Sequence, residues 1–454
     1  MKKLLTIGLV IGLLSGLWSC EKAEVGSNTM TDINEGTNVT EIIDGEDNGI
    51  EEPEVVEEPE VTEEPEVTEE PEVTEEPEVV EEPEVIEEPE VIEEPVDYTA
   101  LITKPYDDVD YTPQEKSISF ESNPKINVKA LFITANTAES SKLDDIIELI
   151  DNTELNALVI DVKNDDGNIL FFSEAAEAVV PEANDGVQIK DMAAFMEKLK
   201  AHNIYTIARI VTFKSPKFAK AFPEKGIVYK NSGKLYYADG SYWASPFDQD
   251  LWDYNIAISK EAIAHGFNEI QFDYVRFPAT GSKLDKSLDF KNPGDHSKTF
   301  AVQEFVKRAY KEISALEAYV ALDVFGWTAT TINDSGIGQH WEGMSNVSDY
   351  MCPMVYPSHY SKNNFGLPVP DAEPYKLVLA SMGDAVKRSE NIQTPAALRP
   401  WLQAFTAGWV KGNISYGRDE IQAQIKACED LGIEDYIFWS SSNNYPTHWF
   451  EEVE

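Results

Sequence analysis

Eight short runs of apolar and β-branched residues alternate with amphipathic segments in this chain, and this alternation leaves few folds open. We expect strands at residues 128–134, 157–162, 205–211, 269–275, 319–325, 350–355, 400–405 and 436–439. Between the first two, Leu143, Ile146, Ile147 and Ile150 recur on one helix face. The pattern predicts an α/β protein with a (β/α)8 TIM barrel. A doubly wound open sheet is the alternative, but its usual glycine-rich phosphate-binding turn is missing.

The first 20 residues have the pattern of a bacterial lipoprotein signal peptide. Lys2 and Lys3 precede an apolar stretch at residues 4–18, which is too short to span a bilayer comfortably. The stretch leads to Cys20 in a Leu-Trp-Ser-Cys sequence that resembles a lipobox. We therefore expect lipidation of Cys20 and an extracytoplasmic, membrane-anchored protein on the cell surface. An ordinary secretory signal with an incidental Cys20 is the alternative.

Residues 21–95 have the composition of a disordered acidic linker. From residue 51 the sequence repeats Glu-Glu-Pro-Glu-Val followed by Val, Thr or Ile, and this repeat carries −23 of the formal net charge of −47. A proline in every repeat excludes a helix or a central strand, and repulsion between the glutamates favours an extended chain. We therefore predict a stalk, which would reach on the order of 140 Å if fully extended as polyproline II.

The remaining sequence divides into a lead-in at residues 96–126 and a globular domain at residues 127–454, which would hold the barrel. Residues 96–454 carry a net charge of −19. This acidity disfavours nucleic acid as a partner, because phosphate binding needs clustered Lys and Arg. Beyond Cys20 only Cys352 and Cys428 remain, so no disulfide framework is expected. We expect a monomer without a cofactor.

Loop lengths indicate which end of the barrel carries the site. Long segments follow strands at residues 212–250, 276–298 and 356–373, whereas the connections that enter strands are short. Active sites of TIM barrels lie where the long loops leave the strands. Polar residues at the C-terminal ends of strands are therefore the candidates.

The fourth strand is the most informative one. Alternation places Glu269, Gln271 and Asp273 inside the barrel, with Asp273 at its upper end. Because buried polar groups are costly unless they bond one another or face a site, Asp273 is a catalytic candidate. The alternative is a structural salt bridge with Arg209 or Arg276.

On the next strand, Asp323 faces inward and should neighbour Asp273. Two carboxylates on adjacent strand ends suit glycoside hydrolysis, since one protonates the leaving oxygen while the other attacks the anomeric carbon or activates water. They would also suit a metal site. Asp161, followed by Lys163, ends the second strand and would add a third polar group to the barrel interior. It would either contact the substrate or form a salt bridge within the barrel.

Several sequence blocks together resemble a bacterial family of putative glycoside hydrolase domains with a TIM-barrel fold, formerly a domain of unknown function. The blocks are FNEIQFDYVRFP at 267–278, VIDVK at 159–163, ARI at 208–210, DVFG at 323–326, GQ at 338–339, PMVYPSHY at 353–360 and RPWLQ at 399–403. The resemblance spans residues 127–446. It implies a carbohydrate-active site around Asp273 and Asp323.

Other residues at strand ends and in the long loops are candidates for substrate binding. The full set is Asp161, Lys163, Arg209, Gln271, Arg276, Trp243, Tyr356, His359, Gln403 and Trp439. Aromatic residues crowd the loop after the third strand, where their rings would stack on sugar faces or pack within a lid; they are Tyr236, Tyr237, Trp243 and Trp252.

The sequence lacks the motifs of two other hydrolase classes. No short His-x-x-x-His spacing supports a zinc enzyme, and no Gly-x-Ser-x-Gly elbow supports acyl hydrolysis. Two functions therefore stay open. One is an extracytoplasmic glycoside hydrolase acting on a cell-wall or exopolysaccharide glycan, and the other is a surface glycan-binding barrel without turnover.

Overall fold

The computed structural model describes residues 105–451. The predicted signal peptide, Cys20, the acidic linker and residues 96–104 of the lead-in lie outside the described residues. Parallel strands close into a barrel in the order β1, β2, β3, β7, β9, β10, β12 and β13, with the short β11 also paired to β10. Their bounds are β1 Lys129–Ile133, β2 Ala157–Lys163, β3 Tyr205–Val211, β7 Glu269–Asp273, β9 Tyr319–Phe325, β10 Tyr350–Met354, β11 Ala397–Leu398, β12 Trp401–Gln403 and β13 Tyr436–Trp439.

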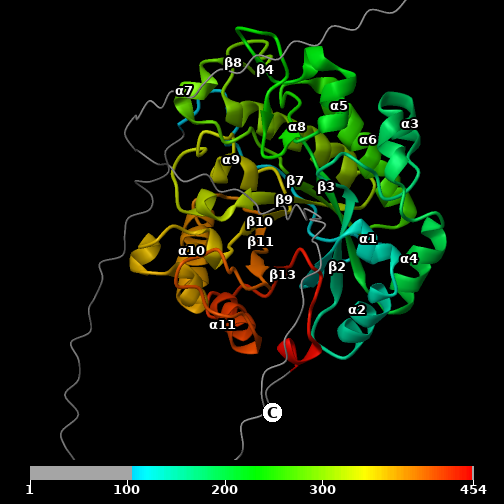
Figure 1. Ribbon diagram of the computed structural model, residues 1–454, viewed down its shortest axis with the longest axis vertical. Coiled ribbons are helices and arrows are strands. Elements are labelled where there is room, and N and C mark those ends of the chain that lie inside the picture. The colour runs from blue at the N-terminus through cyan, green and yellow to red at the C-terminus, as the bar shows by residue number, and fades with distance from the viewer. Residues whose placement is uncertain (1–104, 452–454) are drawn as a thin grey trace, which may run out of the picture. The chain divides into compact units, whose positions relative to one another are not determined.

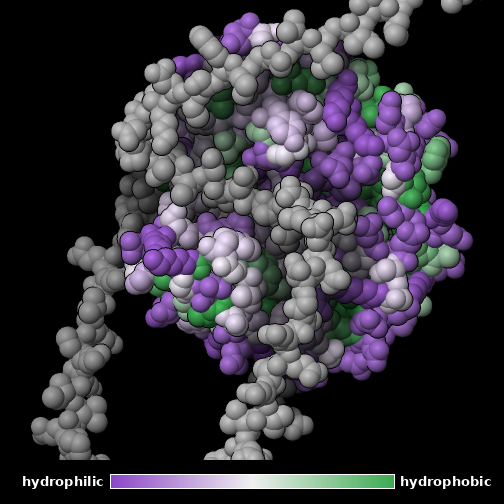
Figure 2. Space-filling model, viewed as in Figure 1, coloured by the Kyte–Doolittle hydropathy of each residue, from purple (hydrophilic) through white to green (hydrophobic). Residues whose placement is uncertain are grey.

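Helices surround this barrel (Figure 1), which confirms the predicted (β/α)8 fold. They are α1 Ala135–Glu139, α2 Lys142–Asp151, α3 Glu174–Val179, α4 Met192–Ala201, α5 Pro216–Ala221, α6 Gln249–His265, α7 Gly281–Asp285, α8 Lys298–Ser314, α9 Trp341–Ser345, α10 Pro374–Ser389 and α11 Arg418–Glu429. Two small antiparallel pairs, β4 Val228–Tyr229 with β8 Leu288–Asp289 and β5 Tyr237–Ala238 with β6 Ser241–Tyr242, lie in the long loops. Hydrophilic side chains dominate the surface over α3 and α4 (Figure 2), as expected of helices whose apolar faces pack inward.

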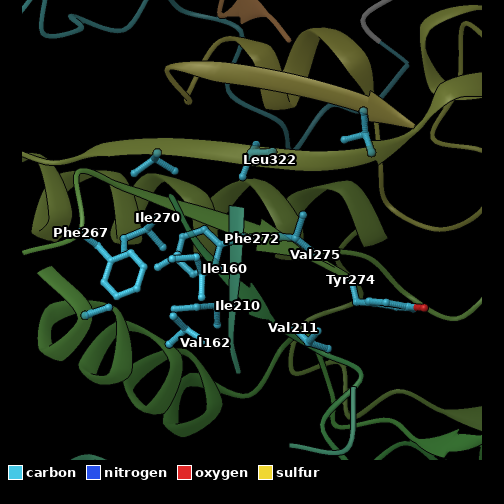
Figure 3. Close-up of a cluster of buried hydrophobic side chains, with 14 of the residues drawn as sticks. Ile160, Val162, Ile210, Val211, Phe267, Ile270, Phe272, Tyr274, Val275 and Leu322 are labelled. Carbon is cyan, nitrogen blue, oxygen red and sulfur yellow. The ribbon is translucent and has the colours of Figure 1, made fainter. Parts of the chain in front are cut away.

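The strands separate two hydrophobic clusters because successive side chains point to opposite faces. The outer cluster lies between the strands and the helices, and Figure 3 shows Ile270 and Phe272 of β7 beside Ile160 and Ile210 in it. The inner cluster fills the barrel with residues such as Val159 and Trp401. Cys352 lies in the inner cluster and Cys428 in the outer one, and both are buried and free of disulfides.

A buried ion network occupies the N-terminal end of the barrel. Arg399 is fully buried; its Nη1 donates to Glu269 Oε1 at 2.6 Å and its Nε to Asp435 Oδ1 at 3.0 Å. Tyr205 donates to Glu269 Oε2 at 3.2 Å. Burial raises the pKa of Glu269 to about 7, although the Arg399 charge opposes this rise.

The described part of the lead-in, residues 105–126, packs along the barrel, and we call it the strap. Asp108 accepts hydrogen bonds from the backbone and side chain of Ser297, the N-cap of α8. Further along, Phe120 packs on the inner cluster, with its ring centroid 5.0 Å from that of Tyr319. The Tyr319 hydroxyl donates to the carbonyl of Asn123 at 2.6 Å. The strap therefore runs from the start of α8 to the N-terminal end of the barrel, where it covers the inner cluster.

Removal of the strap should destabilise the barrel. A chain that begins at residue 127 loses the packing of Phe120 and several buried hydrogen bonds, and we expect it to unfold with about 4 kcal/mol less free energy than a chain that begins at residue 105. Urea unfolding followed by tryptophan fluorescence measures the difference. Equal urea midpoints for the two chains would show that the strap does not contribute to the stability of the barrel.

Among residues 105–451, no helix combines the length and apolar character needed to cross a membrane.

Candidate active site

The two carboxylates predicted to be catalytic lie next to each other at the C-terminal end of the barrel. Phe272 of β7 pairs with Leu322 of β9, so the residues that follow them, Asp273 and Asp323, occupy neighbouring positions on adjacent strands. Both side chains are largely buried, with 7% and 1% of their residue surface exposed. The structure therefore brings the pair together as alternation predicted, while their catalytic roles stay a prediction.

Arg209 of β3 holds three carboxylates around its guanidinium group. Its Nε and Nη2 donate to Asp273 Oδ2 at 3.0 and 2.6 Å, and its Nη1 donates to Asp161 Oδ1 at 2.6 Å. Nη2 also reaches Asp165 Oδ2 at 3.4 Å, and Lys214 Nζ lies 2.9 Å from Asp165 Oδ1. Such charge-assisted bonds fix the orientation of the carboxylates. The salt bridge between Asp273 and Arg209, considered from sequence as the alternative to catalysis, is present.

The pKa values of two of these carboxyl groups move in opposite directions. Burial raises the pKa of Asp161 to about 6, although the charge of Arg209 opposes the rise. Burial also favours the neutral form of Asp165, but the charges of Arg209 and Lys214 outweigh it and hold the pKa of Asp165 below its ordinary value. The cluster thus keeps a fixed negative charge at Asp165 and a titratable group at Asp161.

Asp323 has a different environment from Asp273. Its Oδ1 accepts hydrogen bonds from Gln271 Nε2 at 2.7 Å and Trp401 Nε1 at 2.6 Å, whereas its buried Oδ2 has no hydrogen-bond partner among residues 105–451. Burial, followed by the charge of Asp273, raises the pKa of Asp323 well above its ordinary value. The raised pKa favours the protonated form of Asp323, and Oδ2 is the oxygen available to carry the proton.

The backbone turns sharply where β7 ends. Tyr274 has a φ of 47°, in the left-handed region that a bulky residue rarely adopts. Its amide donates to Asp273 Oδ1 at 2.6 Å, so both oxygens of Asp273 are engaged. The strained residue thus directly follows the candidate carboxylate and helps to orient it.

Gln339 replaces the missing strand partner beside Asp323. Because β7 ends at Asp273, the adjacent edge of β9 has no further strand to pair with. The Gln339 side chain donates to the Asp323 carbonyl at 3.1 Å and accepts from the Phe325 amide at 3.0 Å. The sequence shows this residue within the GQ block at 338–339, but nothing there indicates its partners.

Replacement of Gln339 with leucine should displace Asp323 and loosen the end of β9. Two buried backbone groups lose their partners, at roughly 1–3 kcal/mol of unfolding free energy each. Circular dichroism melting of the variant measures this loss, and Gln339→Glu, which keeps the acceptor oxygen, should lose less. Melting temperatures equal to that of the wild type for both variants would contradict the role of Gln339.

Three residues predicted to bind substrate are enclosed by protein instead. Lys163 contacts the Val211 carbonyl, Ser215 and Asn255 within 3.1 Å, because a register shift between Asp161 and Lys163 turns its side chain away from Arg209. Trp243 is fully buried, with its ring centroid 5.8 Å from that of Tyr274, and Gln403 forms hydrogen bonds with Asp371, Ser358 and the Phe405 carbonyl. A direct contact between these three side chains and a substrate does not fit this structure.

The other predicted residues form two groups, one beside Asp323 and Phe325 and one centred on Tyr356. Gln271 donates to Asp323, and the Arg276 guanidinium lies 4.5 Å from the ring centroid of Phe325 and 4.9 Å from that of Trp243. Tyr356 meets Trp439 and His359 with ring centroids 5.6 and 5.4 Å apart. Burial lowers the pKa of His359 to about 4, so this residue is neutral at pH 7.

Sequence reasoning did not find Asp165, Lys214, Trp401 or Gln339 as members of the site. The RPWLQ block at 399–403 contains Trp401, but only the closed barrel shows that its indole reaches Asp323.

Among the described residues, no group of three or more His, Cys, Asp or Glu side chains is arranged to hold a metal ion. In this structure, the carboxylates around Arg209 are held by a cation of the protein itself.

Comparison with known protein families assigns the chain to one of them. Residues 130–445 match the family described as putative glycosyl hydrolase domain. The chain belongs to this family. The match covers all strands of the barrel except the first residue of β1, and the glycosyl hydrolase family assignment agrees with the class predicted from the sequence blocks. No curated protein matches the chain.

Three solved structures are similar to this glycosyl hydrolase family member, and the first of them supports the fold. The glycoside hydrolase domain of PgaB (BpsB) from Bordetella bronchiseptica has a TM-score of 0.50 at 14% identity, covering 73% of this chain and all of that one. A hypothetical protein from Ruminiclostridium thermocellum is 31% identical over 43% of this chain and 97% of its own, with a TM-score of 0.38. An endo-1,4-β-D-mannanase from Thermotoga petrophila has 15% identity and a TM-score of 0.46, with coverage of 71% and 93%.

Proposed function

We propose that this protein hydrolyses glycosidic bonds of a cell-wall or exopolysaccharide glycan outside the cytoplasm. The observation that carries the proposal is the contrast between two adjacent carboxyl groups. Burial and the charge of Asp273 raise the pKa of Asp323 and so favour its protonated form, whereas Asp273 is paired with Arg209. Glycosidases need this combination of a carboxylic acid and a carboxylate.

In the proposed reaction Asp323 gives its proton to the leaving glycosidic oxygen. Asp273 attacks the anomeric carbon, or takes a proton from a water molecule that does so. Arg209 and the Tyr274 amide hold Asp273 in a fixed orientation before the substrate arrives, which lowers the reorganisation needed in the transition state. Gln271 and Trp401 orient Asp323 in the same way.

One observation favours the second candidate, a surface glycan-binding barrel without turnover. Both oxygens of Asp273 already accept hydrogen bonds, and one of them is held by Arg209. Such a carboxylate is a weaker nucleophile than a free one. A lipid anchor at Cys20 and an acidic stalk are compatible with both candidate functions, since in each case the barrel must reach a polymer from the membrane.

The test is release of reducing ends from a panel of wall and capsule polysaccharides by the purified full-length chain. We expect release by the wild type and none above background by Asp273→Asn, with both proteins equally folded by circular dichroism. Binding without release by the wild type would support the second candidate. Release by Asp273→Asn at the wild-type rate would exclude Asp273 from the chemistry.

A further inference from the structure

A row of aromatic rings that the proposed reaction does not use leads from the surface to the inner cluster of the barrel. Trp409, in the loop after β12, stacks on Phe405 with ring centroids 5.9 Å and planes 20° apart. Phe405 meets Trp439 at 5.2 Å, and Trp439 meets Tyr356 at 5.6 Å. We call these four residues the aromatic row.

Exposure falls steadily along the aromatic row. Trp409 exposes 67% of its surface, Phe405 and Trp439 are half-buried, and Tyr356 exposes 8%. Trp439 and Tyr356 pack on the inner cluster, to which Trp401 also belongs, and Trp401 donates to Asp323. The row therefore connects solvent to the surroundings of the proposed acid, rather than forming an isolated patch.

A second exposed indole lies on the loop that directly follows Asp323 and its strand. Trp327, in the 3-10 helix Gly326–Ala329, exposes 43% of its surface. Its ring centroid lies 6.5 Å from that of Tyr360 and 6.2 Å from that of Phe365. Both exposed indoles are thus supported by other rings, and both belong to loops that leave the strands at the end of the barrel where Asp273 and Asp323 lie.

We propose that the aromatic row is a glycan subsite that binds pyranose rings of a polysaccharide several units away from the bond that is cut. Flat, supported rings offer a large apolar area at low entropic cost, and the C–H faces of pyranoses complement them. A subsite that extends to Trp409 predicts that several units of one glycan chain bind at once, so a polymer should be a better substrate than a short oligosaccharide. This inference rests on the proposed hydrolase function.

The test compares full-length wild type with Trp409→Ala on chitosan, mannan, xylan and soluble peptidoglycan strands. We measure reducing-end kinetics on each polymer and on its trisaccharide, together with retardation in gels that contain the polymer. The expected result is an increase in KM of about tenfold for the polymer and unchanged kinetics for the trisaccharide. Trp409→Phe should keep most of the polymer affinity. Leu316→Ala, which removes an apolar side chain that is 45% exposed after α8, is the matched control and should behave as wild type.

The outcomes separate the subsite from the reaction. Release by the wild type with an unchanged KM in Trp409→Ala overturns the subsite and leaves the hydrolase standing. Retardation of the wild type that Trp409→Ala loses, without release by either, supports the subsite and overturns the hydrolase. Neither release nor retardation on all four polymers overturns both. A change from dimer to monomer in Trp409→Ala by sedimentation, with polymer binding unchanged, would assign the aromatic row to contact between copies and overturn the subsite.

Discussion

Exchange of Asp323 for asparagine is expected to lower the rate of glycosidic cleavage about 10²–10⁴-fold, the usual contribution of a positioned general acid. Asparagine keeps the size of the side chain and can still accept from Gln271 and Trp401. It has no proton to give to the leaving oxygen. Reducing-end release under substrate saturation, with folding checked by circular dichroism, measures the loss.

The pH profile gives the sharper evidence for this role. Wild-type activity should fall as the pH rises through the raised pKa of Asp323, because the proton is then lost. The Asp323→Asn variant should lack this alkaline limb. The limb should move to lower pH in any Asp273→Asn activity that remains, since the Asp273 charge contributes to the raised pKa. Asp371→Asn, which changes another buried carboxyl with a raised pKa, should keep most of the rate and an unchanged limb. A wild-type limb in Asp323→Asn would assign the proton to another group.

Replacement of Arg399 with methionine is expected to reduce the free energy of unfolding by about 3–5 kcal/mol at neutral pH, because it leaves buried carboxyl groups without their cation. Arg399 is fully buried between Glu269 and Asp435, and its guanidinium carbon lies 3.7 Å from the ring centroid of Tyr350. Urea unfolding measures the difference. Arg308→Met, which removes a partly exposed arginine paired with Asp253 and Glu312, is the matched control and should lose less than about 1 kcal/mol.

The decrease in the free energy of unfolding caused by Arg399→Met should become larger as the pH rises. In the wild type the pKa of Glu269 is raised to about 7, so the folded state binds a proton that the unfolded chain releases near the ordinary value. Stability linked to this proton therefore falls as the pH rises toward 7 and then levels off. Without Arg399 the folded-state pKa rises further, so the decline continues above pH 7. The second substitution Glu269→Gln should restore part of the stability. A loss that is constant between pH 6 and pH 9 would show that packing, rather than charge, is what Arg399 supplies.

Local sequence patterns predicted most of the barrel, and the reason lies in the spacing of side chains. The strand pattern at residues 269–275 repeats every two residues, so it predicted which side chains of β7 face inward without knowledge of the rest of the chain. The same alternation in β9 placed Asp323 beside Asp273. The strap is different: residues 105–126 show no strong periodicity, so their packing could not be read from the sequence.

The site shows where local reasoning ends. Asp161 and Lys163 lie two residues apart and were expected to share one wall, but the register shift between them separates their side chains. Trp243 and Trp409 both stand in loops after strands, yet one is fully buried and the other is exposed. Burial of a loop residue depends on which distant segments cover it, and that information is not local.

The sequence by itself determined the barrel and the two candidate carboxyl groups, because these follow from periodicity along neighbouring residues. The boundary between an acidic linker and a globular domain stays a prediction from composition. Only the tertiary structure decided that Asp273 is paired with Arg209 while the pKa of Asp323 is raised. That difference arises from burial and from groups that the closed barrel brings together: Arg209 and Asp273 are 64 residues apart in the chain, and Asp323 and Trp401 are 78 residues apart.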